Sequence, residues 1–296
     1  MTSRFPDPKM MMAIKNLPLA AKTTIDGFMS GINKSKVKGP GLEFSQYRSY
    51  QPGDDLRWLD WKMYARSDRY YIRESEIETS ISVRFLIDAS ASMDHTDNGF
   101  SKIEYARYIA ASLGCLANLQ NDSVGLYVLQ NNQLFSLPAK KDHQHLSRFY
   151  FQLENIEPKG TFTDPVHYKE LFSGSGKKEL LIFITDLYQA NDEIMQLLES
   201  MALLKHEIIV FHLMGNNELT MDYGNFSSLQ DLETGELVPV GQAAGKEIYL
   251  ENLKEYIANL RSQLLDLGII YRMINMQQPI DEMLRDFLQQ RLKLKV

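Results

Sequence analysis

Short apolar runs alternate along the chain with longer segments in which apolar residues recur at helical spacing. Four runs are short and apolar enough for buried strands, and they cover residues 83–87, 180–185, 208–213 and 269–274. Residues 123–130 alternate apolar and polar positions, which indicates a further strand. Helical spacing marks residues 102–120, 192–205 and 247–267. Strands that alternate with helices predict an α/β fold with a doubly wound, mainly parallel sheet.

Smaller elements are expected around this sheet. Residues 225–240 read as an inserted hairpin that turns at Thr234-Gly235, and Pro279 suits the first turn of a last helix. Apolar positions in residues 8–31 are compatible with one or two helices broken near Pro18. Such a helix could lie on a membrane surface, but its polar side lacks a dense basic face, so packing against the main body is favoured.

The loop after the first buried strand carries the clearest chemistry. Residues 83–87 lead into Asp88, Ser90 and Ser92, three small oxygen-bearing side chains at alternate positions. Open α/β sheets bind their ligands beyond the carboxyl ends of the strands. Carboxylate and hydroxyl oxygens are hard donors that suit Mg²⁺ or Mn²⁺ better than a soft metal. We therefore expect a divalent-cation site here, for Mg²⁺ or alternatively Mn²⁺ or Ca²⁺.

An Asp-x-Ser-x-Ser loop resembles the metal-ion-dependent adhesion site of von Willebrand factor A domains. The resemblance implies two further ligands, a Thr from a second loop and an Asp from a third. Thr161 and Asp186 occupy those places in the right order. The alternative is a degenerate site that keeps the turn geometry without binding metal.

A second conspicuous segment covers residues 43–78, where both tryptophans lie among arginines and aspartates. Trp and Arg are enriched at the energetic centres of protein interfaces, so the segment is a candidate partner-binding surface. The alternative is a β-hairpin that caps the sheet. The candidate partner-binding residues are Arg48, Asp54, Arg57, Trp58, Asp60, Trp61 and Arg66.

This segment also carries a family resemblance. The pattern Glu-Phe-x₃-Arg-x-Tyr-x-Pro-Gly-Asp-Asp-x-Arg-x-x-Asp-Trp-x-x-x-Ala-Arg, residues 43–66, resembles the signature of the bacterial "domain of unknown function fifty-eight" family. In that family the signature leads into a von Willebrand factor A-like domain. The resemblance implies an N-terminal extension over residues 1–80 and a Rossmann-type, von Willebrand factor A-like domain over 81–296. It further implies a role as an adaptor for a MoxR-type AAA+ ATPase.

Composition narrows the function classes. The net charge of −6 argues against a nucleic-acid-binding protein, which usually has a basic surface. The chain contains no apolar run of about 18 residues and therefore no expected membrane span. Its start lacks the features of a signal peptide. Its one cysteine, Cys115, fits a reducing compartment. We expect a cytoplasmic protein of unknown oligomeric state.

The rival function is a metal-dependent hydrolase or phosphatase on the same fold. Phosphotransferases of the haloacid dehalogenase kind use an Asp-x-Asp loop after their first strand, and here Ser90 replaces the second Asp, which removes the general acid. No phosphate-binding Gly-x₄-Gly-Lys-Ser/Thr loop occurs. The sequence therefore favours a protein without enzymatic activity that binds an acidic group of its partner through the metal.

Overall fold

The protein is described from a computed structural model. The structure describes residues 16–34, 46–52, 55, 59–74, 80–130, 133–162, 168, 178–189, 191–204, 206–222, 228–239 and 243–294.

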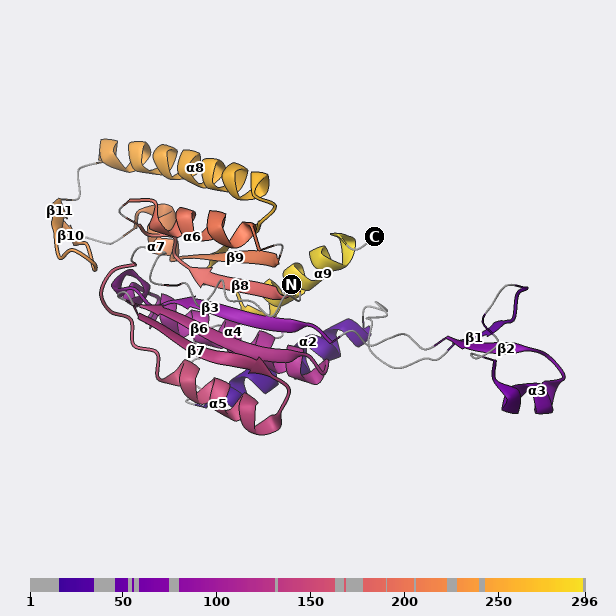
Figure 1. Ribbon diagram of the computed structural model, residues 1–296. Helices are drawn as coiled ribbons and strands as arrows, with labels where there is room; N and C mark the ends of the chain where they lie inside the picture. Colours follow the sequence, from indigo (N-terminus) through magenta and orange to yellow (C-terminus); the bar gives the residue numbers. More distant parts are fainter. Residues whose placement is uncertain are drawn as a thin grey trace.

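A six-stranded sheet forms the centre of the molecule (Figure 1). Each pair of neighbouring strands is parallel except β6 and β7, which are antiparallel at one edge. The predicted doubly wound, mainly parallel sheet is confirmed. In spatial order its strands are β12 (Ile270–Asn275), β9 (Glu207–Met214), β8 (Leu180–Thr185), β3 (Ser82–Asp88), β6 (Ser123–Gln130) and β7 (Gln133–Lys140).

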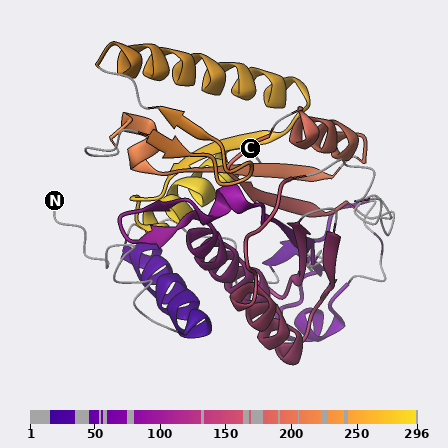
Figure 2. The same ribbon diagram turned by 90° about the vertical axis from the view of Figure 1, so that its left-hand side faces the viewer.

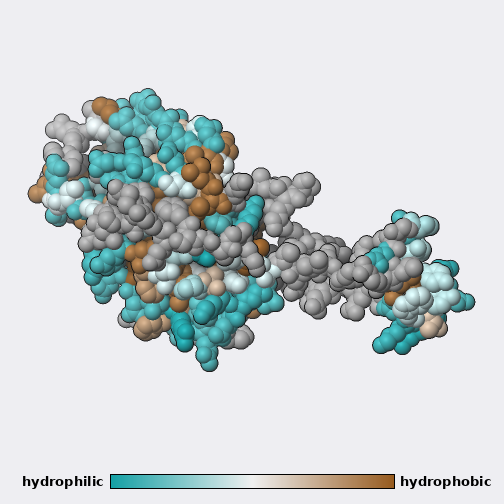
Figure 3. All heavy atoms as spheres, viewed as in Figure 1, coloured by the Kyte–Doolittle hydropathy of each residue, from teal (hydrophilic) through white to brown (hydrophobic). Residues whose placement is uncertain are grey.

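Helices cover both faces of the sheet (Figures 1 and 2). One face packs on α2 (Leu17–Lys34), α4 (Lys102–Leu119), α5 (His143–Glu154) and α9 (Ile280–Leu294). The other face packs on α6 (Glu193–Ala202) and α8 (Ala243–Asp266). Alternate residues of a strand point to opposite faces, so Phe85 and Ile87 enter the first core whereas Leu86 enters the second. The outer side of α8 is mostly hydrophilic (Figure 3).

The first described helix belongs to this body. Pro18 lies in the first turn of α2, where its missing N–H costs no hydrogen bond, so the proline begins the helix instead of breaking it. Leu17, Ala21 and Ile25 are buried in the same core as α4. This packing is the favoured alternative to a membrane-surface helix. Because α2 shares the core of the sheet domain, the division between residues 80 and 81 stays a prediction.

Several short elements complete the described structure. They are β1 (Gln46–Ser49), α3 (Trp61–Ser67), β2 (Tyr71–Glu74), the 3₁₀ turn η2 (Ala91–Asp94), β4 (Thr96–Asp97), β5 (Phe100–Ser101), α7 (Asn216–Thr220), β10 (Ser228–Gln230) and β11 (Leu237–Pro239). The antiparallel pair β10–β11 is the predicted inserted hairpin. Strands β1 and β2 pair with each other and, with α3, lie apart from the central sheet in Figure 1. None of the helices in the described ranges is both long and apolar enough to cross a bilayer.

Candidate functional site

The site lies where the winding of the sheet reverses. Strands β3 and β8 are parallel neighbours, but the helices that follow them, α4 and α6, pack on opposite faces. A crevice forms at such a switch point, beyond the carboxyl ends of the two strands. Asp88 is the last residue of β3, and Asp186 directly follows β8. Parallel pairing therefore brings the two carboxyl groups to one edge, although they are 98 residues apart in the sequence.

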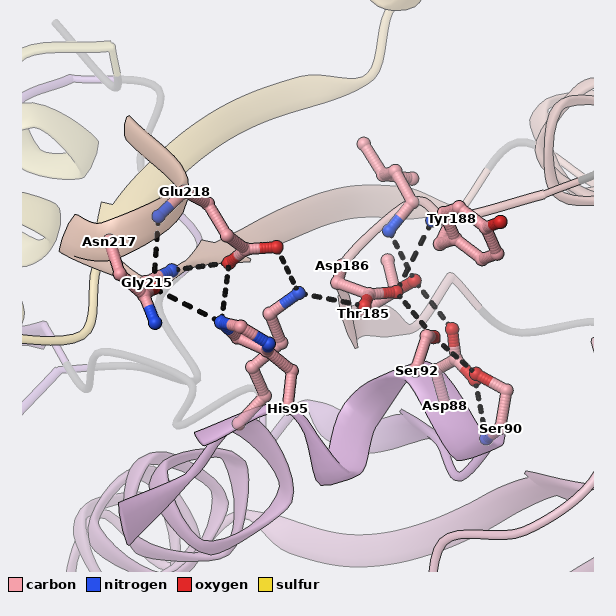
Figure 4. Close-up of polar contacts among 12 residues, drawn as sticks. Asp88, Ser90, Ser92, His95, Thr185, Asp186, Tyr188, Gly215, Asn217 and Glu218 are labelled. Atoms are coloured by element: carbon pink, nitrogen blue, oxygen red, sulfur yellow. Dashed lines mark hydrogen bonds and ion pairs between the residues drawn. The ribbon is translucent and has the colours of Figure 1, made fainter. Parts of the chain in front are cut away.

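Four of the predicted ligands are joined by hydrogen bonds (Figure 4). The Ser90 backbone N–H donates to Asp88 Oδ1 at 3.0 Å. The hydroxyls of Ser90 and Ser92 are 3.0 Å apart, and that of Ser92 donates to Asp186 Oδ1 at 3.1 Å. The Thr185 hydroxyl donates to Asp88 Oδ2 at 2.7 Å, a contact that the sequence did not reveal. Asp88 and Ser90 are fully buried, and Ser92 and Asp186 are each 8% exposed.

Backbone contacts bring the loop of Thr161 to the same place. The Ala91 N–H donates to the Gly160 carbonyl at 2.8 Å, and the Lys159 N–H donates to the Ala89 carbonyl at 2.9 Å. Gly160 has φ of 75°, a left-handed conformation that glycine adopts without steric cost. Thr161 follows directly, so its backbone lies beside the Asp88 loop. The structure thus gathers the five sequence-predicted site residues at one edge of the sheet.

A buried lysine was missed in the sequence. Lys102 is only 3% exposed, and its Nζ lies 2.9 Å from Asp186 Oδ2 and 2.8 Å from Glu218 Oε1. Glu218 comes from α7 and also caps that helix by accepting from the Gly215 N–H. Lys102 is the first residue of α4, where the positive end of the helix dipole disfavours a cation. That unfavourable position is the signal that could have identified it.

The two carboxyl groups differ in charge state. Burial and the negative charge of Asp186 raise the pKa of Asp88 to about 7. Burial alone would also raise the pKa of Asp186, but the Lys102 ammonium overcomes this and holds that pKa below its usual value. Asp186 is therefore ionised at neutral pH, whereas Asp88 is partly protonated and would ionise fully beside a further cation.

The donor set fits a hard divalent cation. Two carboxylates and two hydroxyls converge through the hydrogen-bond chain, and all of them are oxygen donors of the kind that Mg²⁺, Mn²⁺ and Ca²⁺ prefer. No group of three or more His, Cys, Asp or Glu side chains within the described ranges is arranged to hold a metal ion. A cation at this site would therefore depend on the serine hydroxyls and on solvent.

The candidate partner-binding residues lie elsewhere. Asp60 caps α3, its Oδ1 accepting from the N–H groups of Lys62 and Met63. Trp61 is 63% exposed, and Arg66 is exposed in the last turn of the same helix. Arg48 is described only as a backbone position of β1. Asp54, Arg57 and Trp58 lie outside the described residues. Figure 1 places α3 away from β3, the strand that ends at Asp88.

Comparisons with known proteins give one relative by sequence and two solved structures to which this chain is similar. A protein from Mycobacterium tuberculosis, "Uncharacterized protein Rv1480", is 26% identical over 232 residues, which are 77% of this chain and 73% of that protein. Among solved structures, BatB from Bacteroides thetaiotaomicron is 18% identical with a TM-score of 0.47, covering 72% of this chain and all of that one. An aerotolerance-related membrane protein from Bacteroides fragilis is 17% identical, also with a TM-score of 0.47, over 71% of this chain and 98% of that one.

The family comparison covers most of the chain. The family model described as "Protein of unknown function DUF58" matches residues 46–254, which include the segment of the two tryptophans, the Asp88 loop, Asp186 and the β10–β11 hairpin. This chain therefore belongs to the DUF58 family.

Proposed function

We propose that the protein is an interaction module that holds a divalent cation at Asp88, Ser90, Ser92, Thr161 and Asp186, and that the cation binds an acidic group of a protein partner. The observation that carries the proposal is the continuous hydrogen-bond chain from Asp88 through Ser90 and Ser92 to Asp186. It joins two strand ends at the switch point of the sheet, where doubly wound folds bind their ligands.

The charge balance of the site supports a cation. The Lys102 ammonium pairs with Asp186 and Glu218, and no cation is among the groups that shift the pKa of Asp88. Buried carboxylates that lack a counter-charge are costly, and a divalent ion would remove that cost. Mg²⁺ takes near-octahedral oxygen coordination and usually keeps water in some positions. An acidic side chain of a partner would replace such a water, which makes metal binding and partner binding mutually dependent.

The same geometry does not favour hydrolysis by a serine nucleophile. A serine nucleophile is usually activated by an adjacent base such as histidine. Here the hydroxyls of Ser90 and Ser92 contact each other, and that of Ser92 contacts Asp186. His212, the histidine electrostatically coupled to Asp186, is buried and has its Nδ1 2.7 Å from the Tyr271 hydroxyl. We therefore assign the site to binding. The family resemblance suggests a MoxR-type AAA+ ATPase as the first partner to test.

Thermal melting with and without Mg²⁺, Mn²⁺ or Ca²⁺ tests the proposal. A ligand of the native state stabilises it by about 2.7 kcal/mol at a hundred times its Kd, so the wild type should gain several degrees in Tm. Asp88→Ala and Asp186→Ala should lose that gain. Asp266→Ala is the matched control, because Asp266 is an exposed residue at the end of α8. An equal gain in wild type and Asp88→Ala, or no gain at millimolar metal, would contradict the proposal.

Once metal binding is established, partner capture is measured with the same variants. A purified MoxR-type ATPase should bind the wild type in Mg²⁺ and not in EDTA, and it should not bind Asp88→Ala under either condition. Binding that is independent of metal would remove the cation from the partner-binding mechanism.

A further inference from the structure

The turn of the β10–β11 hairpin has a fixed conformation. Asp231 Oδ1 accepts hydrogen bonds from the N–H groups of Glu233 at 2.8 Å and Thr234 at 3.1 Å. The Gly235 N–H donates to the Asp231 carbonyl at 2.8 Å, and Gly235 has φ of 77°, which favours glycine. The side chain of Asp231 thus organises the turn in the way common to Asp-initiated turns. As a result, the hydrogen-bonded backbone of the turn determines the direction in which the Glu233 side chain leaves the hairpin.

The hairpin is tied to the loop that carries Asp186. The Tyr188 hydroxyl donates to Asp231 Oδ2, and the Tyr188 backbone N–H donates to Asp186 Oδ1 at 3.2 Å. One residue therefore contacts both the candidate metal ligand and the base of the turn. This contact holds the hairpin at the carboxyl edge of the sheet, on the side where Figure 1 shows α7.

Glu233 reaches the site from this turn. Glu233 is electrostatically coupled to the site: burial, followed by the charges of Asp88 and Asp186, raises the pKa of Glu233 to about 7, and the hydroxyls of Ser92 and Ser90 act in the opposite direction. Glu233 Oε1 is completely buried and has no hydrogen-bond partner among the described residues. An unpaired carboxylate oxygen beside two other carboxyl groups is unfavourable. A buried carboxylate oxygen without a protein partner is a position that a water molecule or an ion can occupy.

The rest of the hairpin is loosely attached. Leu232 is 47% exposed and Leu237 is 64% exposed, so its apolar side chains contribute little to the core. A hollow of about 570 Å³ lies beside β10, and its lining also includes His95, Asp97 and Asn217. Segments with few buried apolar contacts open at low free-energy cost. Displacement of the hairpin would leave both cores of the sheet intact, because neither core contains a described residue of the hairpin.

We propose that Glu233 is an internal competitor of the partner: its carboxylate covers the Ser90 and Ser92 hydroxyls in the place that an acidic side chain of a partner would take. A partner must then displace the hairpin to reach the cation. The inference rests on the proposed function, because the competition requires a site that binds a carboxylate. It adds the element that keeps the site closed when no partner is present.

Water relaxation of protein-bound Mn²⁺ tests this inference, with acetate as the probe for an incoming carboxylate. In the wild type, Glu233 should exclude solvent, so relaxivity per bound Mn²⁺ should be low and should not change with acetate. Glu233→Gln should raise the relaxivity about twofold, because the cation then keeps an additional exchangeable water. Acetate should lower the relaxivity of this variant again.

Glu236→Gln is the matched control, because Glu236 lies in the same hairpin with an exposed side chain. It should behave as the wild type. Equal relaxivity and equal acetate response in wild type, Glu233→Gln and Glu236→Gln, with Mn²⁺ binding lost in Asp88→Ala, would overturn the inference and leave the metal site intact. If neither the wild type nor Glu233→Gln binds Mn²⁺, the proposed function fails and the inference fails with it.

Discussion

Near the amino end of the sheet a largely buried arginine and glutamate pair with each other, whereas near its carboxyl end Asp88, Asp186 and Glu218 gather around the ammonium of Lys102. Near the start of β3, Arg84 pairs with Glu179 at 2.9 Å, and it also contacts the hydroxyl and ring of Tyr127. At the other end, Lys102 pairs with both Asp186 and Glu218, while no cation of the described residues pairs with Asp88.

The difference in charge balance distinguishes an end of the sheet that only supports the fold from an end that can bind a cation. A buried pair in which each charge has its partner needs no further counter-charge, although removing one partner is strongly destabilising. A cluster with surplus negative charge is stable only if carboxyl groups are protonated or a cation arrives, and the raised pKa of Asp88 shows the first of these responses. Perturbed groups of this kind mark candidate functional sites. Substitutions at the two ends should therefore have separable effects on stability and on metal binding.

The largest effect is expected for Lys102→Met. The change leaves Asp186 and Glu218 without their shared counter-charge, and breaking a buried pair costs about 4 kcal/mol. Urea unfolding in EDTA measures this loss. Millimolar Mg²⁺ should restore more stability to the variant than it adds to the wild type, because the site then carries more negative charge. A smaller metal response in the variant would show that Lys102 assists metal binding.

A similar but slightly smaller loss is expected at the amino end for Glu179→Ala. The change leaves the guanidinium of Arg84, which is 14% exposed at its side chain, without its carboxylate, at a cost of about 3 kcal/mol. Here the Mg²⁺-induced stabilisation should equal that of the wild type. Glu199→Ala on the exposed side of α6 is the control and should change stability by less than about 0.5 kcal/mol. If Mg²⁺ no longer stabilised Glu179→Ala, the ion pair at the amino end of the sheet would influence metal binding at the carboxyl end.

The pH dependence of Asp88→Asn gives an effect of intermediate size. Because the pKa of Asp88 is raised from 3.8 to about 7 on folding, wild-type stability in EDTA should fall as pH rises from about 4 to about 7. Asn cannot ionise, so the variant lacks this loss. Its stability relative to the wild type should therefore increase by roughly 3 kcal/mol over that range.

Comparing the two proteins at each pH cancels the opposite contribution of His212. Burial lowers the pKa of His212 to about 4, so its contribution falls as pH drops below about 6.5 in both proteins. A constant difference between wild type and Asp88→Asn from pH 4 to pH 8 would mean that Asp88 is ionised throughout.

The smallest change in stability is expected outside both ends, for Trp61→Ala. Trp61 is 63% exposed and contacts Tyr64 in an edge-to-face arrangement, with ring centroids 6.3 Å apart. Its removal should therefore cost no more than about 1 kcal/mol. If this segment binds a partner, capture should weaken while the metal response stays that of the wild type. Unchanged capture would exclude Trp61 from the interface.

Much of this structure could be predicted because the relevant signals are local. The apolar run ending at Asp88 predicts a strand that points its last residue toward a ligand-binding edge, and Ser101 with Glu104 caps α4 through a short-range pair of hydrogen bonds. Asp88, Ser90 and Ser92 lie in one loop, so their proximity needs no tertiary information. Thr161 and Asp186 were placed by resemblance, and the structure brings both to the same edge.

The sequence by itself determined the alternation of strands and helices, and with it the sheet and the edge at which its ligands belong, because apolar periodicity acts over a few residues. The other members of the site were decided only by the tertiary structure. Lys102 contacts Glu218, which is 116 residues away in the sequence, and Thr185 contacts Asp88, which is 97 residues away. Glu233 reaches the serines through a hairpin inserted after α7. Such long-range contacts depend on strand register and on the face of the sheet that each helical connection covers. Neither property leaves a local pattern in the sequence.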